Sequence, residues 1–193
     1  MFKVIDNVLS KSYLYELQNY FLSQECEWYF NDQLTGDMSY HKLGSYGFTM
    51  RLHWNQMFVD SHVGTLCRAL ILTAQDKVQE FTNLSYQIIR ARADMTLYNP
   101  EKYRHEIHTD YPYEHFTGIF YLNSSDGNTL LYDRDGLELI TEVEPIENRL
   151  VIFDGLMRHT GHSPAKNKSR VLINMNFMTS ELIDELNVRY GRS

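Results

Sequence analysis

The chain has 193 residues, enough for one well-packed domain and short for two. Its hydrophobic content of 43% and aromatic content of 13% are typical of a globular protein and exclude a disordered one. The net charge of -7 disfavours a nucleic-acid-binding surface, which needs clustered lysine and arginine. The first residues lack the apolar stretch of a signal peptide, and no run of the sequence approaches the roughly 20 apolar residues of a membrane span. We therefore expect a cytoplasmic protein that does not enter a membrane, and the sequence leaves its oligomeric state open.

The first part of the chain is predicted to be helical at two places. Ser10 can cap a helix that runs to about Leu22, and an apolar stripe predicts a second helix over residues 58–81. Residues 24–54 between them are interrupted by glycines and are expected to form irregular strands and loops. No linker divides the sequence, so we predict a single domain over 1–193. Its expected parts are a helical and lid region (1–83), a strand-rich core (84–178) and a C-terminal helix (179–193).

From residue 84 the apolar pattern alternates, as in strands. Residues 86–98 are predicted to form a long strand that carries Arg90, Arg92, Asp94, Thr96 and Tyr98 on one face. Further strands are expected at 105–110, 116–123, 128–132, 138–143, 149–153 and 170–178. Two helices followed by many short strands favour a mainly β fold, an antiparallel sandwich or jelly roll backed by the N-terminal helices.

A metal site is indicated first by His108-Thr109-Asp110. On a strand, residues two apart point to the same face, so His108 and Asp110 could share one cation. This motif alone is weak, because a chain of this composition contains about 0.5 such motifs by chance. A histidine from the distant 159–162 segment would complete two histidines and one carboxylate, the set that leaves open positions on Fe(II). His159 and His162 are three apart and would point to opposite faces of a strand, and His159 lies nearer the end of the 149–153 strand.

Arg170 opens the last alternating stretch. An inward guanidinium at this position could bind a carboxylate through two parallel hydrogen bonds, which lysine cannot reproduce. With this residue the pattern resembles the Fe(II)- and 2-oxoglutarate-dependent oxygenases, in the branch of the prolyl hydroxylases. The resemblance covers about residues 84–178. It rests on Tyr98-Asn99-Pro100, His108-Thr109-Asp110, the strand 118–123, His159 and Arg170. The turn Asp126-Gly127-Asn128-Thr129 departs from the Gly-Gly-x-Thr of that family at its first glycine.

The resemblance implies a double-stranded β-helix with an iron centre. The ligands would be His108, Asp110 and His159, since the family usually places its arginine about ten residues after the distal histidine and His159 precedes Arg170 by eleven. Arg170 would bind the far carboxylate of the cosubstrate 2-oxoglutarate, and Tyr98 would also contact it. The expected reaction is a hydroxylation that consumes O2 and releases succinate and CO2, with ascorbate as an accessory reductant that the sequence does not decide.

The substrate is left open between a peptidyl residue, such as proline, and a small metabolite. Arg92, Tyr111 and Asn174 are expected to line its site, and the aromatic segments 33–54 and 111–117 are expected to cover it. An alternative is a β-barrel metal-dependent enzyme or metal-binding protein that does not use 2-oxoglutarate. Such a protein would keep the metal ligands and have no use for the arginine.

The remaining histidines are interpreted as ordinary ones. His105 and His115 are expected at loop edges, solvated or facing the substrate, rather than as metal ligands. Structural or surface positions are expected for His41, His53 and His62.

Overall fold

The computed structural model describes residues 1–32, 34, 45–54, 57–59 and 61–190. Within them lie three helices, α1 (Lys11–Phe21), α2 (His62–Thr82) and α3 (Ser180–Tyr190). The strands are β1 (Phe2–Ile5), β2 (Tyr29–Asn31), β3 (Gly47–Trp54), β4 (Met57–Phe58), β5 (Tyr86–Leu97), β6 (Phe116–Tyr121), β7 (Thr129–Tyr132), β8 (Leu139–Val143), β9 (Arg149–Asp154), β10 (His159–Gly161) and β11 (Ser169–Thr179).

The two N-terminal helices begin at serines. The Ser10 hydroxyl accepts a hydrogen bond from the amide of Tyr13 at 3.3 Å, as the sequence predicted for α1. In α2 the Ser61 hydroxyl accepts from Gly64 at 3.1 Å, so this helix begins four residues later than predicted. It ends at Asn83, whose left-handed backbone (φ 58°) closes the last turn.

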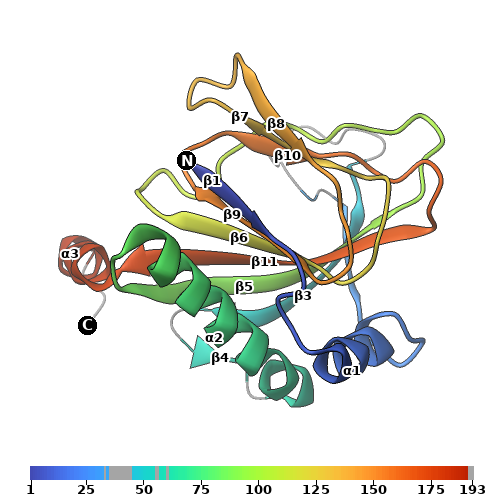
Figure 1. The fold of residues 1–193 in the computed structure, drawn as a ribbon, viewed down its shortest axis with the longest axis horizontal. Helices are drawn as coiled ribbons and strands as arrows, with labels where there is room; N and C mark the ends of the chain where they lie inside the picture. The colour runs from blue at the N-terminus through green and yellow to red at the C-terminus, as the bar shows by residue number, and fades with distance from the viewer. Residues whose placement is uncertain (33, 35–44, 55–56, 60, 191–193) are drawn as a thin grey trace.

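Two antiparallel sheets form the body of the molecule (Figure 1). The large one has the order β1-β9-β6-β11-β5-β3-β2 with β4 beside β3, and the small one has the order β10-β7-β8. Helices α1 and α2 lie across the outer face of the large sheet (Figure 1) and bury apolar side chains in its core, among them Leu17, Phe21, Leu70 and Ile71. The inner faces of the two sheets share a second core: Ile119, Tyr121, Leu131, Val143, Val151, Phe153, Met157 and Leu172. The predicted mainly β architecture with backing helices is confirmed.

The pairing of β5 with β11 decides which side chains face inward. Arg90 lies opposite Asn176, Arg92 opposite Asn174, and Thr96 opposite Arg170. The alternation predicted for β5 therefore holds up to Leu97, where the strand ends. A row of polar side chains runs along the inner face of the large sheet, at the center of an otherwise apolar sandwich.

The strand predicted at 105–110 is wrong. This segment makes one isolated bridge instead, His108 with His159, and Arg104 just before it makes another with His162. Its partner β10 is three residues long and already pairs with β7, and Pro112 has no amide to extend a ladder. Strands β1 and β10 were not predicted; β1 is a largely exposed edge strand without the alternation of a half-buried one.

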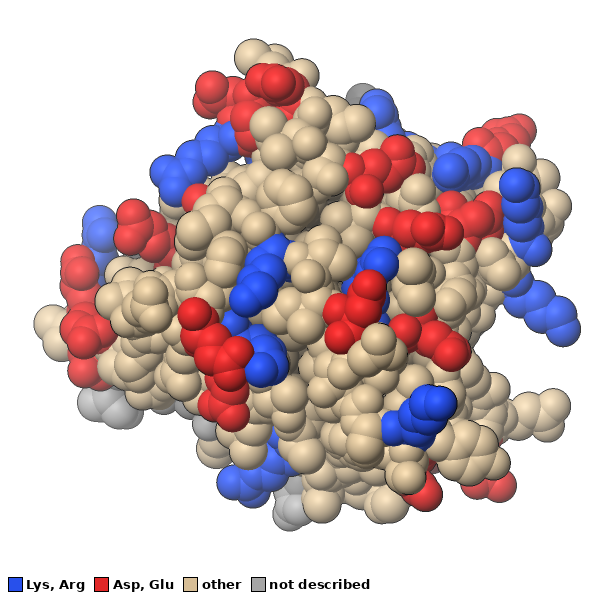
Figure 2. Space-filling view, viewed as in Figure 1, with Lys and Arg blue, Asp and Glu red and all other residues tan. Residues whose placement is uncertain are grey.

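The surface carries mixed charges. On the face shown in Figure 2, acidic and basic side chains are interspersed and no continuous basic patch forms. No helix in the described part of the chain is long and apolar enough to cross a membrane.

Candidate metal centre and cosubstrate pocket

Three side chains converge between the two sheets. One ligand atom each from His108, Asp110 and His159 lies within 4.8 Å of the others. The first two residues come from the segment between β5 and β6, and His159 begins β10. The backbones of His108 and His159 exchange two hydrogen bonds, at 3.0 and 2.9 Å, which bring the two imidazoles to a centroid separation of 4.5 Å. Distant parts of the sequence are thus joined at one point.

Both imidazoles are oriented by backbone carbonyls. The Nδ1 of His108 lies 3.0 Å from the carbonyl oxygen of Glu106, and the Nδ1 of His159 lies 3.5 Å from that of Met157. A carbonyl oxygen only accepts, so Nδ1 carries the proton in each ring and the Nε2 lone pair is left for a cation. Burial, reinforced by the neighbouring His108, lowers the pKa of His159 to about 3 and keeps its imidazole neutral.

Asp110 is a buried carboxylate that remains ionised. Burial alone would raise its pKa, but the guanidinium of Arg90, 2.5 Å from Oδ1, acts with neighbouring groups to hold that pKa well below its usual value. The other oxygen, Oδ2, accepts from Asn176 at 2.9 Å and lies 3.8 Å from Nε2 of His159. Two imidazoles and one carboxylate are a donor set that suits a divalent first-row metal ion.

His162 lies apart from this group. Its amide donates to the carbonyl of Asn128, and its backbone bridges Arg104. Among the described residues, the histidine that joins His108 and Asp110 is His159.

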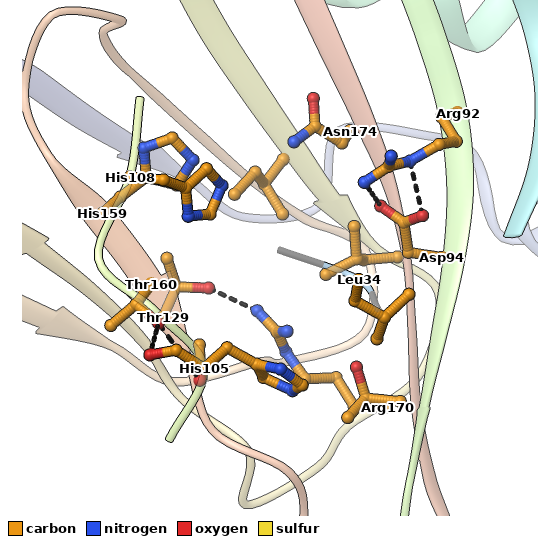
Figure 3. Close-up of a pocket in the computed structure, with 14 residues that line it drawn as sticks. Leu34, Arg92, Asp94, His105, His108, Thr129, His159, Thr160, Arg170 and Asn174 are labelled. Atoms are coloured by element: carbon orange, nitrogen blue, oxygen red, sulfur yellow. Dashed lines mark hydrogen bonds and ion pairs between the residues drawn. The ribbon is translucent and has the colours of Figure 1, made fainter. Parts of the chain in front are cut away.

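A pocket opens beside the two imidazoles (Figure 3). It is lined by Leu34, Arg92, Asp94, Thr96, His105, His108, Ile119, Thr129, His159, Thr160, Gly161, Arg170, Leu172 and Asn174. Residues 33 and 35–44, which include His41 and much of the segment predicted to cover the site, lie outside the described residues.

Arg170 is the buried cation of this pocket, with 5% of its surface exposed. One Nη donates to the hydroxyl of Thr129 at 2.5 Å, and Nε has no hydrogen-bond partner in the described structure. Burial lowers the pKa of the guanidinium, which shows how unfavourable its charge is here. Gly161 gives it room, because a Cβ there would lie 2.8 Å from Nη1. A buried arginine without a carboxylate partner fits an anionic ligand.

His105 lies beside Arg170 and lines the pocket, so of the two positions expected from sequence, solvated or facing the substrate site, the solvated one is wrong. His105 is 5% exposed, and neither ring nitrogen has a hydrogen-bond partner among the described groups. Burial, together with the charge of Arg170, lowers its pKa to about 4. Both ring nitrogens of His105 and the Nε of Arg170, which have no partner among the described groups, therefore line the same end of the pocket.

His115 is also buried, and its position is structural. Its Nδ1 lies 2.7 Å from the carbonyl of Tyr113, and its ring fills the space that a Cβ at Gly155 would occupy. His53 is buried as well and packs edge-on against Phe58.

Comparison with known proteins agrees with this geometry. The family model described as the 2OG-Fe(II) oxygenase superfamily matches residues 93–178, the part that carries all three metal-ligand candidates and Arg170. The predicted resemblance to the Fe(II)- and 2-oxoglutarate-dependent oxygenases is confirmed over this segment. The chain is thus an enzyme of the class that uses Fe(II), 2-oxoglutarate and O2. No curated protein matches the sequence.

Solved structures of oxygenases share the fold. A 2OG-Fe(II) oxygenase from Burkholderia pseudomallei superposes with a TM-score of 0.71 at 14% identity, over 91% of this chain and 84% of that one. A prolyl hydroxylase from Trichoplax adhaerens, bound to a peptide fragment of hypoxia inducible factor, gives 0.69 at 18% identity over 93% and 84%. The epimerase SnoN of nogalamycin biosynthesis gives 0.68 at 12% identity over 93% and 76%. The predicted double-stranded β-helix is confirmed.

The oxygenase departs from the expected pattern at its tyrosine. Tyr98 is 52% exposed and does not line the pocket, because β5 ends one residue earlier and the alternation stops. Tyr121 stands at the buried end instead. Its hydroxyl donates to Thr129 at 2.7 Å, and the guanidinium of Arg170 lies 5.7 Å from its ring centre. Its inward position in β6 could have been read from the alternation of that strand.

The residues expected to face the substrate separate into two groups. Arg92 and Asn174 line the pocket, and Arg92 forms an ion pair with Asp94 at 2.6 Å. Tyr111 is outside the lining, and its ring lies under the guanidinium of Arg90 at 5.2 Å. Arg90 and Asp94 share the inward parity of β5, as the alternation predicted, although the sequence assigned Asp94 no role in the site.

The Asp126 that replaces the first glycine of the family turn has a structural use. Its carboxylate accepts hydrogen bonds from the amides of Ala165, Lys166 and Asn167, at 3.1 to 3.2 Å. It thereby fixes the loop that leads into β11. Gly127 remains a glycine beside Arg170, where a Cβ would lie 2.6 Å from the carbonyl oxygen of His162.

Proposed function

We propose that this oxygenase hydroxylates a peptidyl residue or a small metabolite. In this proposal His108, Asp110 and His159 hold the iron(II), and Arg170 holds the far carboxylate of 2-oxoglutarate. The observation that carries the proposal is the distribution of charge in one pocket. The carboxylate of Asp110, whose pKa is held well below its usual value, lies with two imidazoles at one end, and a buried arginine whose Nε has no partner among the described groups stands at the other.

The three residues fit a divalent metal ion through the ring nitrogens that the histidines present and the negative charge of the carboxylate. Each imidazole presents Nε2 as its free ring nitrogen because its Nδ1 lies against a carbonyl oxygen. Asp110 contributes the negative charge and is kept in place by its own hydrogen bonds. When bound, iron(II) with 2-oxoglutarate and O2 supplies the oxidising power, and the protein supplies orientation and a dry pocket.

The other end of the pocket fits a carboxylate. Arg170 has an unused Nε, and the imidazole of His105 has two unused nitrogens of which one can donate. A carboxylate at this place would pair the buried guanidinium, and the walls formed by Ile119 and Leu172 would keep water away. Arg170 thereby fixes where the cosubstrate lies along the pocket.

The substrate side of the pocket is formed by Arg92 and Asn174. The charge of Arg92 is balanced by Asp94, and the amide oxygen of Asn174 has no partner among the described groups. These groups offer hydrogen bonds without a net charge, which suits a neutral amide or hydroxyl group near the metal. Among the structural neighbours are a prolyl hydroxylase bound to a peptide fragment and the epimerase SnoN bound to nogalamycin RO, which supports both substrate classes equally.

The test is a turnover screen of the purified protein against peptide and metabolite pools, with Fe(II), 2-oxoglutarate and O2, with and without ascorbate. Succinate release that depends on one pool, together with a mass gain of one oxygen atom (about 16 Da) in a component of it, identifies the substrate class. A matched set of variants, His159→Ala and His162→Ala, is assayed with the same pool. The proposal requires that His159→Ala loses succinate release and His162→Ala retains it.

A metal-dependent enzyme that does not use 2-oxoglutarate is the second candidate. It would retain the metal ligands, but nothing would use the guanidinium of Arg170. Unchanged turnover after omission of 2-oxoglutarate would favour this candidate.

A further inference from the structure

Arg90 contacts the metal-ligand candidate Asp110 through Oδ1, whereas Oδ2 is the oxygen that lies 3.8 Å from Nε2 of His159. We propose that Arg90 is a positioning residue that binds Oδ1 of Asp110 and so presents Oδ2 to the metal. This inference rests on the metal centre proposed above. It assigns to Arg90 the orientation of the Asp110 carboxylate. It concerns the apo protein as well as the loaded one, because the contact exists without any metal.

The geometry is a closed ring of three side chains. Nη2 of Arg90 lies 2.5 Å from Oδ1 of Asp110, and Nε of the same guanidinium donates to Oδ1 of Asn176 at 2.8 Å. The Nδ2 of Asn176 returns to Oδ2 of Asp110 at 2.9 Å. Arg90 and Asp110 have side chains that are 12% and 6% exposed, so water competes little for these bonds. Every bond of the ring helps to fix the rotation of the carboxylate.

The two oxygens of Asp110 consequently face different partners. Oδ1 is occupied by the guanidinium, while Oδ2 lies 3.8 Å from Nε2 of His159. A hydroxyl from Thr117 also approaches Oδ2, at 3.3 Å, from the side of β6. The arrangement favours one carboxylate oxygen as the ligand and disfavours binding of a metal through both.

The backbone around Asp110 makes such a clamp necessary. Asp110 lies outside any strand, and the nearest pairing of its segment is the isolated bridge at His108. In a paired strand the pleat fixes the direction of each side chain, but Asp110 is not in a paired strand, so its direction is not fixed in this way. Arg90 and Asn176 sit opposite each other in the long pair β5–β11, which is a rigid support. The rigid sheet thus orients a ligand that the loop leaves undetermined.

Arginine suits this position because its donors point in two directions. The Nε serves Asn176 and the Nη2 serves Asp110, and the ring of Tyr111 lies 5.2 Å from the guanidinium carbon. Lysine would retain the charge but has a single nitrogen that cannot occupy both places. Arg90→Lys therefore separates positioning from charge.

The experiment is an anaerobic titration of the purified apo protein with Co(II), followed by visible absorption. It compares wild type, Arg90→Lys, Arg90→Met and Asn176→Ala. The matched control is Arg149→Lys, since Arg149 likewise binds an aspartate, Asp6, in its case through two donors at 2.6 and 3.0 Å, on the same sheet but away from the pocket. Removal of a partner that orients a metal ligand typically weakens metal binding about 10- to 100-fold.

We expect Arg90→Lys and Asn176→Ala to bind Co(II) at least about tenfold more weakly than wild type, with a changed absorption spectrum, and Arg149→Lys to bind as wild type does. Affinities of Arg90→Lys and Asn176→Ala within twofold of wild type, with the wild-type spectrum, would overturn the inference. Asn176→Ala keeps the ion pair and so decides the matter if the Arg90 variants do not fold. Asp110→Ala is titrated alongside them: if it also binds Co(II) as wild type does, the proposed metal centre itself is wrong.

Discussion

His108 and His159 are joined through their backbones, and their side chains follow from that pairing. The two hydrogen bonds between them, at 3.0 and 2.9 Å, place the imidazoles side by side on the inner side of the small sheet. Strand β10 supplies His159 and is itself held by β7. The position of the metal centre therefore depends on β10, a strand of three residues. A substitution that weakens the pairing of β10 with β7 would displace His159 even though His159 itself is unchanged.

The first prediction concerns the three ligands. His108→Ala, Asp110→Ala and His159→Ala each remove one of the converging donors, so each should lose tight Fe(II) binding and succinate release. Asp110→Glu should also be impaired, because its longer side chain displaces the carboxylate from its partners. Anaerobic Fe(II) titration measures the affinity. Loss of iron in His162→Ala with retention in His159→Ala would contradict the assignment.

The second prediction concerns Arg170. Its replacement by alanine removes the buried positive charge at the closed end of the pocket, and losing such a charge-assisted pair costs about 2–5 kcal/mol. We expect the KM for 2-oxoglutarate to rise at least about 30-fold, which corresponds to about 2 kcal/mol, while Fe(II) affinity changes little. Arg170→Lys should recover part of the affinity, since it restores the charge without the fork. An unchanged KM in Arg170→Ala would exclude the anchor role.

The third prediction concerns the pH dependence of stability through His105. The pKa of His105 is about 4 in the folded protein, below the 6.5 of a free histidine. Between these two pH values the unfolded chain therefore carries a proton on His105 that the folded chain does not. His105 should therefore lower the stability as pH falls from about 6.5 to about 4, by up to about 1.4 kcal/mol per pH unit. Above pH 6.5 it should have no such effect.

His105→Phe, which cannot titrate, measures this contribution. Between pH 7 and pH 4.5 its Tm should fall less than that of the wild type. Equal acid slopes in His105→Phe and wild type would show that His105 is not held neutral.

The fourth prediction concerns the attachment of the N-terminal segment. The Asn148 side chain donates to the carbonyl of Leu9 at 2.9 Å and accepts from its amide at 2.8 Å, both in the interior. Asn148→Ala leaves these two backbone groups without partners, at a cost of about 1–3 kcal/mol each. Its φ of 63° adds strain for alanine. We expect a lower Tm by thermal melting; Asn148→Gly should relieve the strain but not restore the bonds, and a wild-type Tm in both would contradict this account.

Sequence alone determined the parts that depend on local periodicity. The alternation in residues 86–98 gave the inward face of β5 correctly, since a strand has a period of two whatever its partners. The capping serine and apolar stripe located α1, and the order of His108, Asp110, His159 and Arg170 indicated the family before any contact was known. Side-chain chemistry and spacing are sufficient for such statements.

Tertiary structure decided what depends on partners distant in the chain. That His159 rather than His162 meets Asp110 follows from the bridge to His108, which no local pattern encodes. The burial of His105 and the exposure of Tyr98 were also decided by the tertiary structure, because the packing of a loop and the end of a strand set them. The clamp of Arg90 on Asp110 joins two residues through the register of β5 with β11 and the path of a loop. Local sequence fixes which face a side chain takes in a strand, but pairing between distant segments fixes what it meets there.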